Sequence, residues 1–262
     1  MSLKNLNFTK VNPTGNITLL YNMENIDKND IQKISKISMN KLNLHAEQVG
    51  FINNTHLQMM GGEFCGNACR SFASYLAFND GEFLREKTYK ITCSGEESIL
   101  QINVRASHVN NIFLAKIKMP KNISIKILNL NLSENKTQTI CEVVFSGIVH
   151  FIVEAPIDNT IVDEIRKYCK TKKYPAFGIM FFDFKTMYMT PYVEVQGFEG
   201  VWENSCGSGT TAVGYYLNKY EDMDSGKIIQ PGGWLEFSLE NDTIFIDGPV
   251  EIVAMGTSYI DV

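Results

Sequence analysis

Two short segments, one in each half of the chain, share the same order of residue types. Each places a cysteine before a glycine and a small polar residue, and each then opens an apolar run with helical spacing. The first, Gly62–Ala68, contains Cys65, and the second, Glu203–Thr210, contains Cys206. Apolar residues that recur every three or four positions behind each cysteine predict a helix that begins there. The chain is thereby constrained to place two thiols at the N-termini of two helices.

A thiol at the start of a helix lies in an unusual electrostatic environment. The first backbone N–H groups of a helix lack intrahelical acceptors, and the positive end of the helix dipole lies among them. This position favours a thiolate over a thiol, and it can also hold an anion such as a carboxylate. Two such positions in one chain suggest a paired acid and base.

The two segments belong to a longer internal repeat. Marker segments recur in the same order in both halves, and the ordered set predicts two related domains that each offer one cysteine-tipped helix. In addition to the two cysteine segments, the matched pairs are Thr14–Leu20 with Ser146–Ile152, Ala46–Ile52 with Tyr174–Met180, and Cys93–Gly95 with Gln230–Gly232.

Short segments rich in β-branched and aromatic residues occupy most of the chain between these helices, which predicts an α+β fold. We expect two pseudo-symmetric domains, each an antiparallel sheet packed around its central helix. The N-terminal domain is expected over residues 1–119, with 250–262 returning to it, and the C-terminal domain over residues 120–249. Further helices are expected at Asp30–Ser38 and Thr160–Lys170.

Composition narrows the classes of function. The net charge of −5 and the mixed charge pattern provide no basic stripe, so nucleic acid is not an expected partner. No apolar run is long enough to span a bilayer, and the first residues lack a signal-peptide core, so we expect a cytoplasmic protein without membrane contact. Six cysteines are too few for a disulfide scaffold of 262 residues. No cluster of metal-ligand spacing is present, so no metal site is expected.

Five motifs carry a resemblance that covers nearly the whole chain. The chain resembles the diaminopimelate epimerase superfamily of cofactor-independent racemases, and within it the histidine racemases associated with opine-metallophore synthesis. The motifs are Asn-Pro-Thr-Gly-Asn at 12–16, Glu-Gln-Val-Gly-Phe-Ile at 47–52, Glu-Phe-Cys-Gly-Asn-Ala at 63–68, Trp-Glu-Asn-Ser-Cys-Gly-Ser-Gly-Thr at 202–210 and Gln-Pro-Gly-Gly at 230–233.

The resemblance implies a two-domain fold and a site in the cleft that needs neither pyridoxal phosphate nor metal. It implies that Cys65 and Cys206 are catalytic, one thiol on each face of the substrate α-carbon. One would remove the α-proton as a thiolate while the other delivers a proton to the opposite face.

Other residues follow as candidates for substrate binding, with an amino acid as the small-molecule partner. Backbone N–H groups of Gly66, Asn67, Gly207 and Ser208 are expected to hold the substrate carboxylate. Asn16, Gln48 and Glu203 are candidates for holding its ammonium and carboxylate groups. Glu47 is the candidate for recognising the substrate side chain, such as an imidazole.

Two departures from the superfamily pattern bear on the substrate. True diaminopimelate epimerases carry an arginine shortly before the second cysteine, which clamps the distal carboxylate. Here the stretch at 195–200 reads Val-Gln-Gly-Phe-Glu-Gly, and Ile148 stands where an asparagine would read the distal end. A second anionic amino-acid head would find no bidentate partner there.

Alternative interpretations remain at this level. A racemase for another amino acid, including one of broad specificity, is the nearest, and a phenazine-type isomerase shares the fold but lacks the cysteine pair. A non-catalytic amino-acid-binding module is the alternative from a different class. His150 is expected to be a hydrogen-bonded residue of the core or of the surroundings of the site, and the other four cysteines to be buried apolar residues. The oligomeric state, a homodimer included, stays open.

Overall fold

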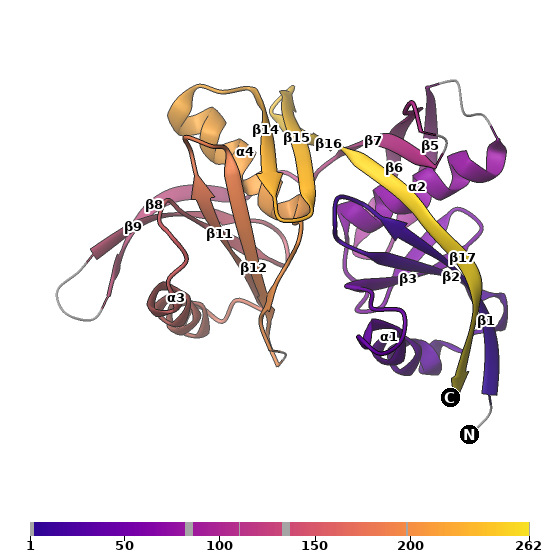
Figure 1. The fold of residues 1–262 in the computed structure, drawn as a ribbon. Helices are drawn as coiled ribbons and strands as arrows, with labels where there is room; N and C mark the ends of the chain where they lie inside the picture. The colour runs from indigo at the N-terminus through magenta and orange to yellow at the C-terminus, as the bar shows by residue number, and fades with distance from the viewer. Residues whose placement is uncertain (1–2, 82–85, 110, 133–136, 198, 262) are drawn as a thin grey trace. The chain divides into compact units, whose positions relative to one another are not determined.

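The structure, a computed structural model, describes residues 3–81, 86–109, 111–132, 137–197 and 199–261 (Figure 1). The chain divides into two compact units. Unit 1 comprises Met1–Lys118 and Asp247–Val262, and unit 2 comprises Met119–Ile246. None of the helices in the described part of the chain combines the length and apolar character needed to cross a membrane.

Unit 1 contains two α-helices and eight strands among its described residues. In chain order they are β1 Leu3–Asn12, β2 Thr18–Asn22, α1 Ile31–Met39, β3 Gln48–Asn53, β4 His56–Met59, α2 Gly66–Asp80, β5 Lys87–Cys93, β6 Glu96–Ala106, β7 Ile112–Lys118 and β17 Pro249–Asp261.

Unit 2 follows with a similar alternation. Its elements are β8 Ser124–Asn131, β9 Thr137–Val144, β10 Val149–Val153, α3 Asn159–Lys172, β11 Ala176–Asp183, β12 Tyr188–Val195, β13 Val201–Trp202, α4 Gly207–Glu221, β14 Ser225–Gln230, β15 Gly233–Glu240 and β16 Thr243–Asp247.

Strand pairing repeats between the two units. In unit 1, β1 pairs with β2, β2 with β3, β3 with β4, β4 with β5 and β5 with β6. In unit 2, β9 pairs with β10, β10 with β11, β11 with β12, β12 with β14 and β14 with β15. The same order of parallel and antiparallel pairs occurs in both, which confirms the internal repeat predicted from the sequence.

The expectation of purely antiparallel sheets is wrong. The pairs β2 with β3, β4 with β5, β10 with β11 and β12 with β14 are parallel. A helix lies between the two strands of each pair in the chain, namely α1, α2, α3 and α4 in that order. Parallel neighbours require such a crossover, whereas tight hairpins join antiparallel ones. Each unit is therefore a mixed α/β structure.

Helix α2 lies at the centre of unit 1, where it packs against β1, β2, β5, β6, β7 and β17 (Figure 1). Its buried apolar residues Ala68, Phe72, Ala73 and Ala77 follow the helical spacing seen in the sequence. The helix ends at Gly81, whose φ of 68° is the left-handed conformation that favours glycine at a helix C-terminus.

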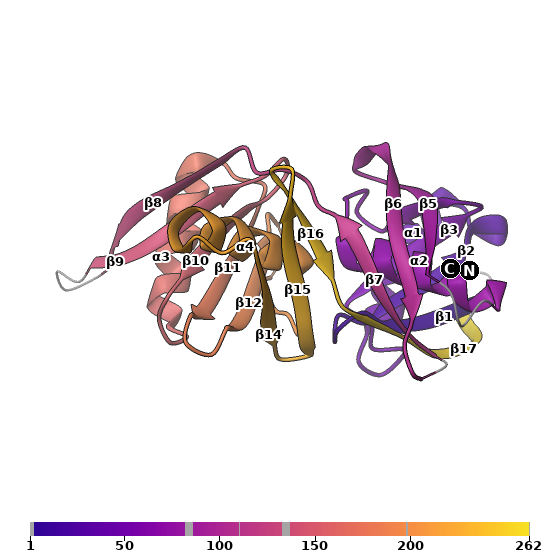
Figure 2. The same cartoon turned by 90° about the horizontal axis from the view of Figure 1, so that it is seen from above.

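Helix α4 has the corresponding place in unit 2 and packs against β9, β10, β11, β14 and β15 (Figure 2). It buries Ala212, Val213 and Leu217. Tyr215 is buried whereas Tyr216 is half-buried and donates a hydrogen bond to Glu154. Both predicted cysteine-tipped helices are thus confirmed.

The C-terminal strand completes unit 1. Strand β17 pairs antiparallel with β1 from Leu3 opposite Asp261 to Asn12 opposite Glu251, with a register shift between Lys10 and Val11. It also pairs with β7. In Figure 1, β17 (yellow) runs beside β1 (indigo), although the two lie at opposite ends of the sequence.

Candidate active site

Cys65 is the N-cap residue of α2. Its backbone is extended, with φ −133° and ψ 112°, and its sulfur accepts a hydrogen bond from the backbone N–H of Ala68 at 3.5 Å. The side chain is half-buried. Gly66 and Asn67 form the first turn behind it, where backbone N–H groups have no carbonyl of their own helix to bond. Cys65 therefore lies at the N-terminus of a helix, as predicted from the sequence.

Cys206 occupies the same position on α4. Its φ of −128° and ψ of 111° closely match those of Cys65, and its sulfur accepts from the backbone N–H of Gly209 at 3.4 Å. The Ser208 hydroxyl lies 3.5 Å from the sulfur. Gly207 and Ser208 supply the first turn. The internal repeat therefore includes the backbone conformation at the two cysteines.

The surroundings of the two thiols differ. Burial raises the pKa of the Cys206 thiol well above its usual range, and the nearby Glu203 carboxylate raises it further. The hydrogen bonds from Ser208 and Gly209 act in the opposite direction but are outweighed. At Cys206, desolvation therefore penalises the charged sulfur more than the helix N-terminus stabilises it.

A chain of polar side chains reaches the sulfur of Cys65. Asn16 donates its amide to a Glu47 carboxylate oxygen at 2.7 Å and accepts from the Gln48 amide. Cys65 donates its thiol proton to the Gln48 oxygen at 2.9 Å. Asn67 donates to the Asn16 oxygen at 3.3 Å. Unit 1 thus brings together all five of the predicted side chains that it contains.

A tight turn between β1 and β2 places Asn16 in this chain. The Asn12 side chain accepts the Gly15 backbone N–H at 2.6 Å, and the Thr14 hydroxyl donates to the Pro249 carbonyl at 3.1 Å. Thr14 has a φ of 63°, an uncommon conformation for a β-branched residue. The contact with Pro249 ties the turn to β17.

Arg70 is a functional candidate that the sequence analysis missed. It is fully buried on α2 and donates to Asn67 at 3.0 Å, to the Ala115 carbonyl at 2.9 Å and to the Pro249 carbonyl at 3.2 Å. An arginine is rarely buried completely. Its position three residues after Asn67 places it on the buried face of α2, a helical spacing that could have identified it.

The turn after β5 supports the segment that leads to Cys65. The Ser94 hydroxyl accepts from the Met59 backbone N–H at 2.9 Å and donates to the Glu63 carbonyl at 3.0 Å. Gly95 has a φ of 74°, and a Cβ there would lie 2.3 Å from the Phe64 backbone nitrogen. Only glycine allows this close approach.

Gln230 has the matching position in unit 2, as the sequence repeat predicts. Its buried side chain accepts the Cys206 backbone N–H at 2.8 Å and donates to the Thr210 hydroxyl at 3.0 Å. Thr210 in turn donates to the Cys206 carbonyl at 2.8 Å. The backbone of Cys206 is therefore held on both sides by one closed set of hydrogen bonds.

A pocket of about 480 Å³ lies beside the segment that precedes Cys206 within unit 2. Glu203 lines it together with Trp202 and Asn204 from the same segment. The remaining lining residues are Ile157, Asn159, Thr190 and Pro231. The pocket combines an aromatic ring, a carboxylate and side-chain amides, which suits a small polar ligand.

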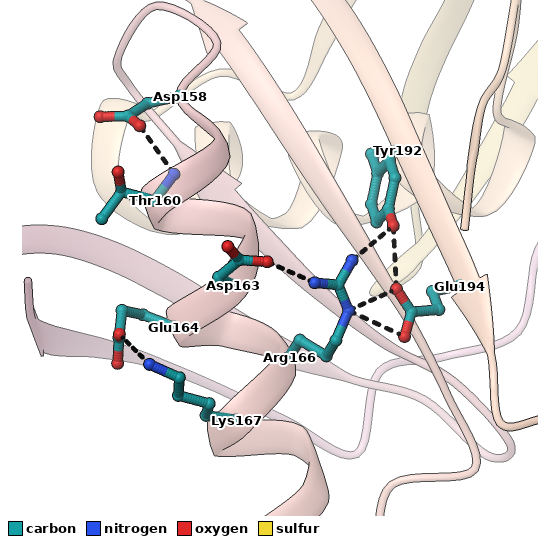
Figure 3. A network of polar contacts seen from close by, with 8 residues as sticks. All are labelled: Asp158, Thr160, Asp163, Glu164, Arg166, Lys167, Tyr192 and Glu194. Atoms are coloured by element: carbon teal, nitrogen blue, oxygen red, sulfur yellow. Dashed lines mark hydrogen bonds and ion pairs between the residues drawn. The ribbon is translucent and has the colours of Figure 1, made fainter. Parts of the chain in front are cut away.

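Arg166 is the only arginine in the sequence of unit 2, and its guanidinium is already occupied (Figure 3). It donates to Glu194 at 2.9 and 3.1 Å, to the Tyr192 hydroxyl at 2.9 Å and to Asp163. The ring of Tyr192 packs edge-on against Trp202, with centroids 5.1 Å apart. Arg166 thus connects α3 to β12, and its guanidinium is engaged by these partners. This agrees with the sequence, in which no arginine stands at the position that clamps a distal carboxylate.

His150 lies in β10 and is fully buried, but the expectation that it is hydrogen-bonded is wrong. Neither ring nitrogen has a hydrogen-bond partner among the described residues. Burial lowers its pKa to about 3. The ring packs edge-on against Phe145 and fills the space beside Gly178, where a Cβ would lie 2.3 Å from its Nδ1.

The other four cysteines are buried, as predicted. Cys69 and Cys93 contact each other, whereas burial raises the pKa of Cys141 and of Cys169 to about 12. Within the described ranges, no group of three or more metal-binding side chains comes together.

Known proteins resemble this chain over nearly its full length. A family model described as the histidine racemase CntK N-terminal domain matches residues 5–259. A histidine racemase from Fusobacterium nucleatum subsp. nucleatum is 53% identical, with 97% of each chain covered. A histidine racemase from Staphylococcus aureus is 28% identical, with all of both chains covered.

The fold also occurs among solved structures. A predicted epimerase from Pseudomonas aeruginosa has a TM-score of 0.70 at 12% sequence identity, covering 96% of this chain and 98% of its own. At that identity the likeness concerns the fold alone.

Proposed function

Because this chain belongs to the histidine racemase family, we propose that it interconverts the L and D enantiomers of histidine by two-base catalysis at Cys65 and Cys206, without a cofactor. The structural observation that carries the mechanism is the repeat itself. Each unit presents one cysteine as the N-cap of its central helix, with nearly the same backbone conformation. Two thiols, one on each face of the substrate, can remove a proton from one face and deliver one to the other.

Removal of the α-proton is the difficult step, because the α-proton of an amino acid is very weakly acidic. The developing negative charge spreads onto the substrate carboxylate, so donors aimed at the carboxylate lower the barrier. First-turn N–H groups of Gly66, Asn67, Gly207 and Ser208 are suited to this task, since they lack acceptors in their own helices.

Glu203 and Glu47 serve different parts of the substrate in this proposal. Glu203 lines the pocket beside Cys206 and binds the α-ammonium group. Glu47 lies at the far end of the polar chain from Cys65 and accepts a hydrogen bond from the imidazole. Asn16 and Gln48 complete the set that orients the substrate head group. The occupied Arg166 and the apolar Ile148 disfavour a second anionic group.

The decisive experiment is solvent-deuterium exchange followed by NMR, with each of the twenty amino acids in turn. Exchange at Cα reports proton abstraction directly, and chiral chromatography of the same samples reports inversion. We expect histidine to exchange and invert fastest. Faster inversion of diaminopimelate, included as a further substrate, would overturn the substrate assignment. Full inversion of histidine by a Cys65→Ala or a Cys206→Ala enzyme would overturn the mechanism.

A further inference from the structure

The polar chain beside Cys65 consists largely of side-chain amides, and amides have two ends. Each of Asn16, Gln48 and Asn67 carries an oxygen that accepts and a nitrogen that donates. A chain of such groups can therefore run in either of two directions, and the groups at its ends decide which one is adopted. The direction matters here because the chain terminates on the sulfur of Cys65.

Arg70 sets the direction from one end. A guanidinium can only donate, so the Asn67 oxygen faces it at 3.0 Å and the Asn67 nitrogen is turned towards the Asn16 oxygen. Arg70 cannot reorient freely, because it also donates to the backbone carbonyls of Ala115 and Pro249. This end of the chain is therefore held by two other strands of unit 1.

Glu47 sets the same direction from the other end. An ionised carboxylate can only accept, so the Asn16 nitrogen faces Glu47 at 2.7 Å and the Asn16 oxygen is turned away from it. The Asn16 oxygen then receives both the Asn67 and the Gln48 nitrogens. Reversal of Gln48 alone would bring two oxygens together. Gln48 is thus left with its oxygen towards Cys65.

We propose that Arg70 and Glu47, acting through Asn67, Asn16 and Gln48, present an oxygen to the sulfur of Cys65 and so favour its protonated, proton-donating form in the protein without substrate. The inference rests on the proposed function only in taking Cys65 to be a catalytic thiol. Gln48 and Asn16 are then positioning residues for the proton of Cys65. A thiolate in the same place would face the negative end of the Gln48 carbonyl dipole at 2.9 Å.

Other groups act on the same sulfur. The N–H of Ala68, at 3.5 Å, and the cation of Arg70 favour the thiolate. The thiols of Cys69 and Cys93 also lie near Cys65, and the Glu63 carboxylate acts on Cys93. These groups are unchanged by substitution at position 48, so a Gln48 variant isolates the contribution of the amide oxygen.

The test is the pH dependence of alkylation of Cys65 by iodoacetamide, resolved from Cys69 by fragment-ion mass spectrometry. Only the thiolate reacts, so the midpoint of the rate reports the pKa of Cys65. In Gln48→Ala we expect the midpoint to fall by about one pH unit, with alkylation at pH 7 about three to ten times faster. A midpoint that rises would show that Gln48 presents its nitrogen to the sulfur. An unchanged midpoint would show that neither the oxygen nor the nitrogen of Gln48 affects the pKa of Cys65. Either result overturns the proposal.

A second variant acts at a distance from the sulfur. Asn16→Ala removes the oxygen that fixes Gln48, so the Gln48 amide can turn its nitrogen towards Cys65, and the midpoint should again fall. If Gln48 is only a spacer, Asn16→Ala leaves the midpoint where it is. Circular dichroism establishes that each variant is folded, and Asn16→Ala carries the test if Gln48→Ala is not. Gln101→Ala, at an exposed position of β6, is the matched control and should match the unsubstituted protein.

Failure of this inference can be told apart from failure of the proposed function. Alkylation requires no turnover, so it tests the direction of the amide chain even in an inactive protein. A racemase that remains active as Cys65→Ala would remove the catalytic role of Cys65 and leave the alkylation result standing. As a second readout, the acid limb of the pH profile of kcat/KM for histidine should move to lower pH in Asn16→Ala along with the alkylation midpoint.

Discussion

At the scale of single residues, the two helix-tip thiols differ more than their shared sequence context suggests. Cys65 is half-buried and hydrogen-bonded to Gln48, whereas Cys206 is buried beside Glu203. The two thiols thus share the same N-cap backbone conformation but differ in their burial and in the polar groups around them. Catalysis in both directions requires each thiol to exist in both protonation states, and the pair titrates as a unit when its members interact.

The first prediction separates these thiols from the other four. Cys65→Ala and Cys206→Ala should each reduce histidine racemisation to background, because alanine cannot transfer a proton. Cys141→Ala, which alters a buried cysteine of β9, is the control and should retain the chemistry. Racemisation is followed by circular dichroism of the substrate. Background activity in the control as well would point to a general loss of folding instead.

The second prediction concerns Glu47. Glu47→Gln removes a charge that can accept a hydrogen bond from imidazole, and a charged hydrogen bond contributes on the order of 1.5–3 kcal/mol. We therefore expect kcat/KM for histidine to fall by roughly ten- to a hundredfold. The exposed Glu97→Gln in β6 is the control. Unchanged histidine kinetics in Glu47→Gln would remove Glu47 from substrate recognition.

At the scale of elements, each cysteine loop is held by the strand that follows its helix. Ser94 holds the loop before Cys65, and Gln230 holds Cys206 itself. In both units a helix connects the supported loop to the supporting strand, so the parallel crossover brings the two back together. Both units thus hold the cysteine loop by hydrogen bonds from the corresponding segment of the repeat, but a serine provides them in unit 1 and a glutamine in unit 2.

The third prediction tests the support in unit 2. Gln230→Leu leaves the buried Cys206 N–H without its acceptor, which costs about 1–3 kcal/mol. It also removes the hydrogen bond that the Thr210 hydroxyl accepts, although this hydroxyl still donates to the Cys206 carbonyl. Both tryptophans, Trp202 and Trp234, lie in unit 2, so their fluorescence during urea unfolding reports on this unit. We expect a lower urea midpoint than in the exposed control Gln196→Leu. Equal midpoints would show that the hydrogen bonds of Gln230 contribute no net stability.

At the scale of the whole molecule, a strand remote in sequence completes unit 1. β17 lies beside β1 and β7, and its Pro249 carbonyl accepts from both Arg70 and Thr14. The C-terminal strand thereby orders two groups around Cys65. Stability of unit 1 and geometry of its candidate site are coupled through this strand.

The fourth prediction concerns the stability of the folded protein at low pH. Burial lowers the pKa of His150 to about 3, against an ordinary value near 6.5, so the unfolded chain binds a proton that the folded protein does not. Stability due to this residue is intact above pH 6.5 and falls as pH drops from there towards 3. Between pH 7.5 and pH 5 the loss is about 2 kcal/mol.

His150→Leu should remove this loss, so the difference in unfolding free energy between pH 7.5 and pH 5 should shrink by about 2 kcal/mol. Tryptophan fluorescence in urea measures it, because His150 lies in unit 2 with both tryptophans. The exposed His108→Leu is the control and should leave the difference as it is. An unaltered difference in His150→Leu would show that the buried ring is protonated in the folded state.

The sequence by itself determined the features that are encoded locally. The starts of α2 and α4, the position of a thiol at each, the repeat of the two halves and the buried cysteines were all predicted. The helix starts and their thiols depend on residues within about one helical turn of each other, where capping and spacing act directly. The resemblance to histidine racemases could also be recognised from the sequence, because its motifs are short and contiguous.

Only the tertiary structure decided which distant residues meet. Much of β8 and β17 is exposed, so these strands lack the alternation that identifies a half-buried strand in a sequence. The sequence led us to expect purely antiparallel sheets and a hydrogen-bonded His150, and Arg70 was overlooked. Pairing across more than two hundred residues, and the desolvation that raises the pKa of Cys206, arise from packing that no local pattern contains.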